Sequence, residues 1–274
     1  MKTLWTRSKT ALVFVSVMIA GIYGSIYSYA VLMLLIIIMS LSEFFKLYGT
    51  QLQNSKAKNL YFPLAASFGV VGFLITFPLL QPFIPANIWV LLLLAPFVLL
   101  IVELFSHSEY PFQNIGLVIF SICYVALPVW LLNTIIVYEN NYQPFIPLGI
   151  ILLIWSNDAF AYLVGSAIGK HKIIPRISPG KTWEGSVGGI VCNFIVAYLL
   201  TVLFGVFSFT EWCVIAALIS VFATLGDWVE SMMKRSLNVK DSGTLLPGHG
   251  GMLDRFDAFF FAIPFVAAYI WLIR

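Results

Sequence analysis

Charged side chains are scarce in this sequence of 274 residues: Asp, Glu, Lys and Arg make up 10% of it, whereas 61% of the residues are hydrophobic. Soluble globular domains carry about a quarter charged residues. A soluble core of this size does not need so much apolar surface, so the composition excludes that class. We expect an all-α, polytopic bundle of membrane-spanning helices.

Cysteine and histidine are also rare, with three of each, and the formal net charge is only +3. Cys123, Cys192 and Cys213 lie inside apolar segments and are odd in number, which argues against a disulfide framework. His249 has no second histidine or cysteine at a spacing that suits zinc. The small net charge, with basic residues distributed over loops, argues against nucleic acid as a partner.

Apolar runs long enough to cross a bilayer recur along the whole chain. We predict nine spans, with boundaries good to a few residues, at 10–27, 29–47, 61–80, 87–105, 114–134, 147–168, 184–205, 212–233 and 256–273. The first of them could also be a signal peptide with a weak cleavage site at Ala30. Because the next span follows at once, we interpret it as a membrane helix, and cleavage stays an alternative.

The basic residues predict the orientation of these spans. If the N-terminus is cytoplasmic, fourteen of the fifteen Lys and Arg residues fall in inside loops and only Arg274 lies outside, as the positive-inside rule requires. We therefore expect a multi-pass protein of the inner (plasma) membrane with its N-terminus and its polar loops in the cytoplasm.

The polar residues are unevenly distributed along the chain. Residues 1–140 read as scaffold helices joined by plain loops, whereas 141–274 hold nearly all the unusual polar chemistry and form the predicted catalytic region of one integrated membrane domain. In this second region, Asp158 lies about 16 Å of helix before the loop at Gly169. Intramembrane acids usually mark a substrate, ion or proton path, although a structural hydrogen bond or ion pair is the alternative.

A polar stripe ends the eighth span. Asp227, Glu230, Ser231 and Lys234 recur at helical spacing and share one face, which must contact protein or water rather than lipid. A transport pathway would show the same pattern.

The start of the ninth span carries two acids three residues apart, Asp254 and Asp257. Helix capping alone could explain them, but hard oxygen ligands here, with Asp227 and with Asp158 as a further candidate, would suit Mg²⁺. His249 could donate to a phosphate, act as an acid or base, or shape the turn.

A glycine-lysine-threonine sequence at residues 180–182 resembles the end of a Walker A loop. The glycine required five positions before Gly180 is Pro175, and no strand precedes it, so a P-loop is excluded. Lys181 remains a candidate phosphate ligand. The glycine pairs in GSAIG (165–169) and GSVGG (185–189) favour helix packing over catalysis.

The run SMMKRSLNVKDSGTLLPGHGGMLDRFD, residues 231–257, resembles the signature of the phosphatidate cytidylyltransferases, also called CDP-diacylglycerol synthases. The upstream segments NDAFAYLVG and SPGKTWEGSVGG are similar to that family as well, so the resemblance covers about residues 155–257. It implies transfer of a cytidylyl group from CTP to phosphatidic acid in the bilayer, with release of pyrophosphate. It also implies Mg²⁺ as cofactor; a second cation and a homodimer stay open.

The clusters and the resemblance together define the candidate residues. The candidate catalytic residues are Asp227, Asp254, Asp257, His249, Lys234, Arg235 and Arg255, of which Asp227, Asp254 and Asp257 are the candidate metal ligands. The candidate substrate-binding residues are Asn157, Asp158, Ser178, Lys181, Ser231, Lys240, Asp241, Gly250 and Gly251.

Two other functions stay open as alternatives. A CTP-dependent lipid kinase would share the architecture but release CDP. An ion-coupled transporter would explain the buried acids, but it has no need of the loop around His249.

Overall fold

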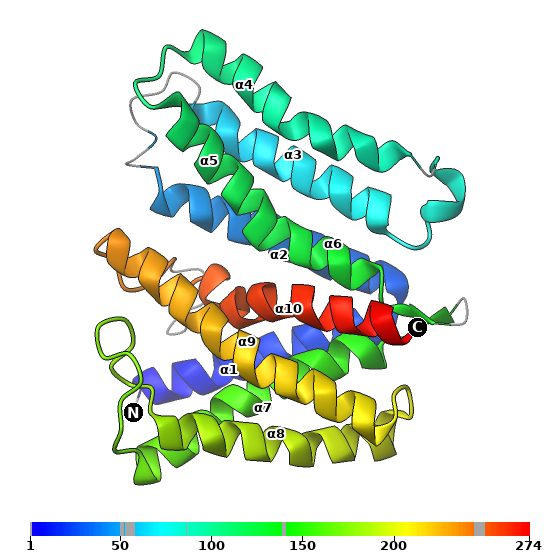
Figure 1. The fold of residues 1–274 in the computed structure, drawn as a ribbon, viewed down its shortest axis with the longest axis vertical. Coiled ribbons are helices and arrows are strands. Elements are labelled where there is room, and N and C mark those ends of the chain that lie inside the picture. Colours follow the sequence, from blue (N-terminus) through cyan, green and yellow to red (C-terminus); the bar gives the residue numbers. More distant parts are fainter. Residues whose placement is uncertain (1, 50–51, 53–57, 86, 139–140, 244–249) are drawn as a thin grey trace. The chain divides into compact units, whose positions relative to one another are not determined.

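The computed structural model describes residues 2–49, 52, 58–85, 87–138, 141–243 and 250–274, and these are helical almost throughout (Figure 1). Eight helices among the described residues are long and apolar enough to cross a membrane, and the first helix has a shorter apolar part, Lys9–Gly24. These helices match the nine predicted spans. The prediction of an all-α bundle is confirmed, and the chain is a multi-pass membrane protein.

The chain forms two units, Met1–Thr134 with Asp241–Arg255, and Ile135–Lys240 with Phe256–Arg274. The predicted scaffold and catalytic regions, divided at residue 140, stay a prediction about function. Asp241–Arg255, which holds the second part of the signature run, belongs to the first unit.

The first unit is built from six α-helices and three shorter helical segments. They are α1 (Lys2–Gly24), α2 (Ile26–Leu47), α3 (Lys58–Thr76), η1 (Gln81–Phe83), η2 (Ile88–Leu94), α4 (Ala95–Ser106), α5 (Pro111–Ser121), the π-helical η3 (Ile122–Ala126) and α6 (Leu127–Asn133).

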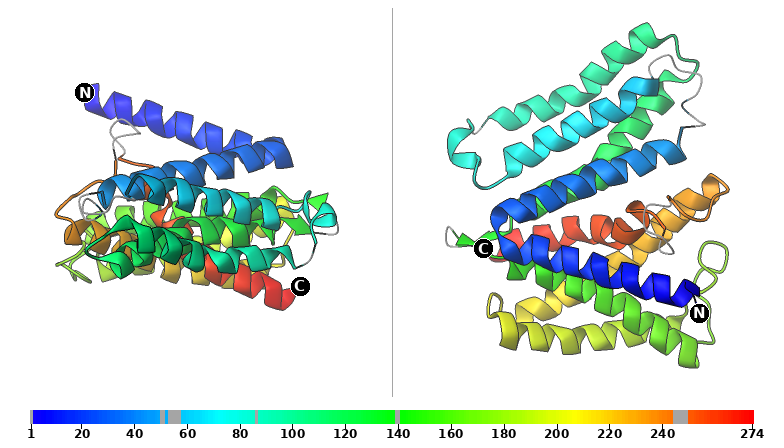
Figure 2. Two further views of the ribbon diagram at one scale, coloured as in Figure 1. Left: turned by 90° about the horizontal axis from the view of Figure 1, so that it is seen from above. Right: turned by 180° about the vertical axis from the view of Figure 1, so that it is seen from behind.

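The helices α1 and α2 form a helical hairpin that turns at one residue, Ser25 (Figure 2). Ser25 accepts a hydrogen bond from the backbone N–H of Ser28 at 3.1 Å, and the Ser28 hydroxyl accepts one from the N–H of Ser25 at 2.9 Å. This capping box satisfies two backbone donors that a helix start leaves without partners. It explains why α2 begins three residues before the predicted span at 29–47.

A π-helical segment joins α5 and α6 within one membrane span, Pro111–Asn133. Pro128 has no N–H to donate to the carbonyl of Tyr124, four residues before it, and a wider turn accommodates the missing bond. Beyond the proline, Trp130 donates from Nε1 to the Gly69 carbonyl of α3 at 2.8 Å. The indole occupies the space that a side chain at Gly72 would need.

The second unit contains β1 (Val137–Tyr138), β2 (Asn141–Tyr142), α7 (Phe145–Ile168), α8 (Trp183–Phe204), α9 (Phe209–Ser236) and most of α10 (Leu253–Ile273). The two short strands pair antiparallel, Val137 with Tyr142 and Tyr138 with Asn141. Arg274 donates to the carbonyls of Ile135 and Val137 at 2.8 and 3.2 Å, and partial burial lowers the pKa of its guanidinium.

Glycines let α7 and α8 pack against each other along most of their length, as Figure 1 shows. A Cβ at Gly185 would lie 2.6 Å from the Ala161 carbonyl oxygen, and one at Gly189 would lie 2.9 Å from the Asn157 carbonyl oxygen. Both distances are too short for a real side chain. The predicted role of these glycines in helix packing is confirmed.

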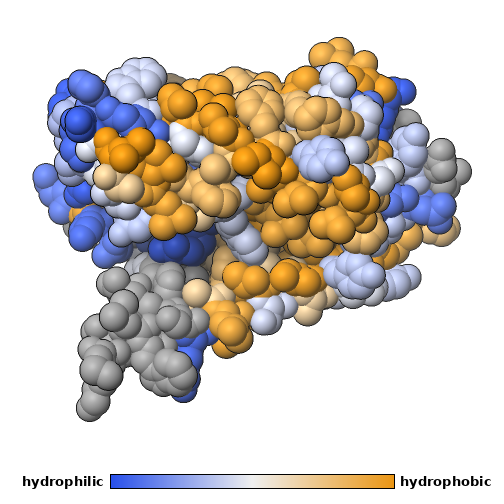
Figure 3. Space-filling view, turned by 90° about the horizontal axis from the view of Figure 1, so that it is seen from below, coloured by the Kyte–Doolittle hydropathy of each residue, from blue (hydrophilic) through white to orange (hydrophobic). Residues whose placement is uncertain are grey.

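A chain of polar side chains crosses α7, α8 and α9. The hydroxyl of Ser156 on α7 donates to Asn193 Oδ1 on α8, and Asn193 Nδ2 donates to Ser220 Oγ on α9 at 3.0 Å. Asn193 and Ser220 are buried, so the bond between them forms away from water, whereas Ser156 is half-buried. On the face shown in Figure 3, hydrophobic side chains fill a broad band and hydrophilic ones gather at its two ends.

Candidate functional site

Close packing of α9 on α10 positions the first candidate residues. Gly226 on α9 has no side chain, and a Cβ there would lie 2.8 Å from the Asp257 carbonyl oxygen and 2.7 Å from Phe261 Cβ. The next residue on α9 is Asp227. The glycine therefore allows the Asp227 turn to lie against the Asp257 turn of α10.

Four carboxylates, Asp158, Asp227, Glu230 and Asp257, form what we call the acidic cluster. Asp227, Glu230 and Asp158 each raise the negative potential at the Asp257 carboxylate. Asp257 also accepts a hydrogen bond from the N–H of Ala258 at 2.7 Å. Like charges near one another within a membrane are costly unless positive charge offsets them.

Two lysines supply part of that positive charge. Lys181 Nζ pairs with Asp227 and lies 5.8 Å from the centre of the Trp228 ring. Lys234 pairs with Glu230 one helical turn before it, and the Glu230 side chain is only 1% exposed. The predicted polar face of α9 thus pairs its acids with lysines, one of them from a loop.

The loop between α7 and α8 presents Lys181 to the cluster. It closes as a narrow ladder in which Ile173 N–H donates to the Lys181 carbonyl at 3.3 Å and Trp183 N–H donates to the His171 carbonyl at 3.0 Å. Thr182 caps α8 by accepting from the Gly185 N–H at 3.2 Å. Lys181 is therefore the residue just before a capped helix start, and its backbone is fixed on both sides.

Asp254 lies in the first unit and has different partners. Its carboxylate accepts the Ser242 N–H at 3.1 and 3.0 Å and the Gly251 N–H at 2.8 Å. Glu43 of α2 accepts hydrogen bonds from the Leu253 N–H and from the Ser242 hydroxyl. Asp254 thus connects the backbone of Ser242 and of Gly251 to the first turn of α10.

The remaining predicted residues differ in burial and in backbone conformation. Asn157 is buried, and its Oδ1 lies against Gly189 of α8. Gly250 has a left-handed backbone (φ 83°), which favours glycine. Ser178 and Ser231 are half-buried; Arg235, Lys240, Asp241 and Arg255 are exposed. His249 lies outside the described residues.

Sequence reasoning missed Glu43 and Trp228. Glu43 lies within an apolar span, and a carboxylate in such a place is itself a signal of function. Trp228 sits next to Asp227 in the sequence, and its position under Lys181 depends on a loop 46 residues away from Asp227. No local pattern encodes that contact.

The carboxylates of the acidic cluster are also the candidate ligands for a metal ion. Among the described residues, no three His, Cys, Asp or Glu side chains come close enough together to hold a metal ion by themselves. Mg²⁺ commonly takes only one or two carboxylates and completes its shell with water and substrate phosphates. The oxygen donors of Asp227 and Asp257 fit that pattern.

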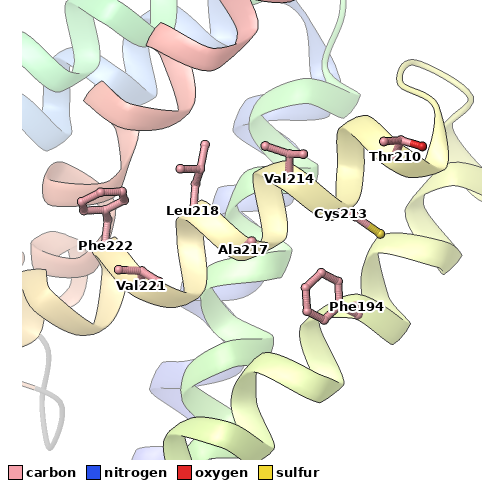
Figure 4. A pocket seen from close by; sticks show the side chains of 8 residues that line it. All are labelled: Phe194, Thr210, Cys213, Val214, Ala217, Leu218, Val221 and Phe222. Atoms are coloured by element: carbon pink, nitrogen blue, oxygen red, sulfur yellow. The ribbon is translucent and has the colours of Figure 1, made fainter.

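A separate groove of about 450 Å³ lies along α9 beside α8 (Figure 4). Its lining residues recur at helical spacing on one side of α9, joined by one from α8: Phe194, Thr210, Cys213, Val214, Ala217, Leu218, Val221 and Phe222. None of them is charged. The groove therefore offers no ionic contact to a charged ligand.

These features define a polytopic membrane protein with a lysine-paired acidic cluster built on its spanning helices. The sequence matches the cytidylyltransferase family over residues 5–273, and the chain belongs to that family.

Several similar proteins are phosphatidate cytidylyltransferases by name. The protein of Staphylococcus saprophyticus is 42% identical over 171 residues, which cover 61% of this chain and 64% of that protein. The Staphylococcus aureus protein is 39% identical over 171 residues with the same coverage, and the Bacillus subtilis protein is 48% identical over 116 residues, 42% of this chain and 43% of its own length. The match thus spans just under two thirds of the length of these staphylococcal proteins.

Proposed function

We propose that this protein transfers a cytidylyl group from CTP to phosphatidic acid, giving CDP-diacylglycerol and pyrophosphate for phospholipid synthesis. The observation that carries the proposal is the acidic cluster with Lys181 and Lys234 paired to it, on helices that span the membrane. The family and the names of the relatives support the same reaction. One substrate is a lipid and the other a soluble nucleotide, so the site must be reachable from both phases.

In this reaction a phosphate oxygen of the lipid attacks the α-phosphorus of CTP, and the bond to the β-phosphate breaks. The nucleophile is already ionised, so the protein needs to supply position and charge compensation rather than a strong base. Lys181 and Lys234 pair with carboxylates of the cluster, and Arg235 follows Lys234 in the chain. Their ammonium and guanidinium groups would stabilise the departing pyrophosphate and the lipid phosphate.

Mg²⁺ is the proposed cofactor, and Asp227 and Asp257 would hold it with phosphate oxygens of the nucleotide. When bound, it would supply positive charge next to the phosphates. Asp254, three residues before Asp257 in α10, stays in the proposed ligand set. Lys181 pairs with Asp227, and the phosphates of bound CTP would offer its ammonium group a second partner.

The proposed orientation places the N-terminus and the loops that carry Lys181 and Lys240 in the cytoplasm, where CTP is found. Its support is the distribution of basic residues among the loops. The proposed location is the plasma membrane of the cell.

The test uses the purified full chain in mixed micelles with phosphatidic acid, Mg²⁺ and CTP labelled at the α-phosphate. We expect the label to enter the organic phase, in a lipid that yields CMP on hydrolysis, while pyrophosphate is released. Removal of metal with EDTA should abolish the transfer, and added Mg²⁺ should restore it. Accumulation of CDP without labelled lipid would indicate a lipid kinase, and no consumption of CTP with any metal would reject both enzymes.

A further inference from the structure

We propose that Glu43, on α2, is a positioning residue that holds Ser242 and the start of α10 and, through Ser242, orients Asp254. This inference rests on the proposed function, because it assigns Glu43 a role in that reaction. Glu43 lies at the end of the second predicted span, far in sequence from the signature run, and neither the resemblance nor the candidate set included it.

The first contact of Glu43 is with the start of α10. Its Oε2 accepts the backbone N–H of Leu253, the first residue of the helix, at 2.8 Å. That N–H has no partner within the helix, and a negative charge at a helix N-terminus is also favoured by the helix dipole. The carboxylate is 5% exposed, so the bond is shielded from water.

The second contact of Glu43 is with Ser242. The Ser242 hydroxyl donates to Glu43 Oε2 at 3.3 Å, while the Ser242 N–H donates to the Asp254 carboxylate. Ser242 therefore connects the two acids directly. Asp254 in turn accepts the Gly251 N–H at 2.8 Å, so the two carboxylates hold residues on both sides of 243–250.

The glycines of the signature run fit this arrangement. A Cβ on Gly251 would be in hard contact with Glu43 Oε2 and with Ser242 Oγ, and a Cβ on Gly243 would lie 2.7 Å from Glu43 Oε1. The carboxylate thus lies directly against bare backbone at two points. The Glu43 carboxylate is a physical reason why positions 243 and 251 are glycine, because it occupies the space that a side chain would need.

A buried carboxylate is a costly way to join a helix to a loop, because its charge must be desolvated. An apolar side chain would pack α2 at lower cost but could not accept these hydrogen bonds. Groups that hydrogen-bond around a ligand residue fix its orientation, and their loss typically lowers metal affinity or activity roughly 10- to 100-fold. We expect Glu43 to act on Asp254 in this way.

The experiment compares Glu43→Ala and Glu43→Gln in the full chain, with Mg²⁺ titrated at saturating CTP and phosphatidic acid. Glu43→Ala should lower kcat roughly 10- to 100-fold and raise the Mg²⁺ concentration for half-maximal activity, with KM for phosphatidic acid unchanged. Glu43→Gln should recover most of both values, because an amide oxygen can accept the same two hydrogen bonds.

Glu103→Ala is the matched control. Glu103 is also a buried carboxylate of the first unit, 6% exposed, and it accepts hydrogen bonds from Tyr61 and Ser106. Its loss should lower the thermal midpoint as Glu43→Ala does, but it should leave the Mg²⁺ dependence of the folded protein unchanged. That difference separates positioning from general stability.

Two results would overturn the inference: a Glu43→Ala protein with wild-type kcat and Mg²⁺ dependence, or a Glu43→Gln protein as impaired as Glu43→Ala. If Glu43→Ala does not fold, a Glu43→Gln protein near wild type supports the role of the acceptor oxygen. If the wild-type chain transfers no cytidylyl group, the proposed function fails instead. Amide hydrogen exchange then decides, because the inference requires faster exchange at Leu253 and Ser242 in Glu43→Ala than in the wild type, with Glu43→Gln close to the wild type.

Discussion

At the scale of single residues, the carboxylates of the acidic cluster repel one another. Asp158, Asp227 and Glu230 each add negative charge near Asp257, whereas Lys181 and Lys234 form ion pairs with Asp227 and Glu230. Sites that bind a cation or a polyanion with its metal often hold unfavourable charge in the free protein. Removing one charge should therefore affect stability and activity in opposite directions.

Asp257→Asn tests this opposition. We expect activity to fall roughly 100-fold or more, as when a single group that stabilises developing charge is removed. The thermal midpoint should rise or stay unchanged, because repulsion and the burial of charge are relieved. Thermal unfolding and cytidylyl transfer are measured on the same detergent-purified protein.

Ser208→Ala is the control for Asp257→Asn. Ser208 caps α9 by accepting the Glu211 N–H, and loss of such a cap costs about 1 kcal/mol. This variant should be less stable yet keep its activity per folded molecule. An Asp257→Asn protein that is both destabilised and active would contradict the proposed role of the cluster.

Lys181 makes a second prediction at this scale. Lys181→Ala removes the ammonium group that pairs with Asp227, and hydrogen bonds to charged groups contribute about 1.5–3 kcal/mol. We expect kcat/KM for CTP to fall roughly 10- to 100-fold. Lys172→Ala, an exposed lysine of the same loop, should change kcat/KM less than about twofold; equal losses in both variants would reduce Lys181 to a general surface charge.

At the scale of the elements, the sequence predicted the helices well because each is a long apolar run. Helices α2 and α10 begin three residues before the predicted spans, where Ser25 caps α2 and Glu43 accepts the N–H of Leu253 at the start of α10. The pairing of Lys181 with Asp227, and of Glu43 with Ser242, could not be predicted. Such contacts join residues 46 and 199 positions apart, and only the packing of whole helices determines them.

The packing of α7 on α8 gives a prediction for one glycine. In Gly185→Ala the new methyl group would collide with the Ala161 carbonyl and approach Gly165, so the helices must separate. Overpacking of this kind costs about 1–3 kcal/mol. The free energy of unfolding should fall by that amount in a denaturation series in detergent.

Gly116→Ala is the matched control for Gly185→Ala. A Cβ at Gly116, on α5, meets no atom within 4 Å, and alanine is the better helix former by about 1 kcal/mol. This variant should be as stable as the wild type or more stable. Equal destabilisation by both substitutions would show that glycine flexibility, rather than close contact, matters in α8.

At the scale of the whole molecule, the prediction concerns which loops face which side of the membrane. In a background without Cys123, Cys192 and Cys213, a cysteine is introduced as Arg176→Cys or as Tyr138→Cys. A membrane-impermeant maleimide applied to intact cells should label the second variant and leave the first unlabelled until the cells are opened. Reversed labelling would invert the proposed orientation.

The contacts of Glu43 also impose an order in time. Its partners Ser242 and Leu253 follow it by 199 and 210 residues in the chain, so they leave the ribosome long after α2 has entered the bilayer. Until then the Glu43 carboxylate lacks these two hydrogen-bond donors. A chain truncated after α9 would keep the Glu43 carboxylate among apolar helices without these two donors. A membrane protease could recognise truncated chains by this exposed polar group.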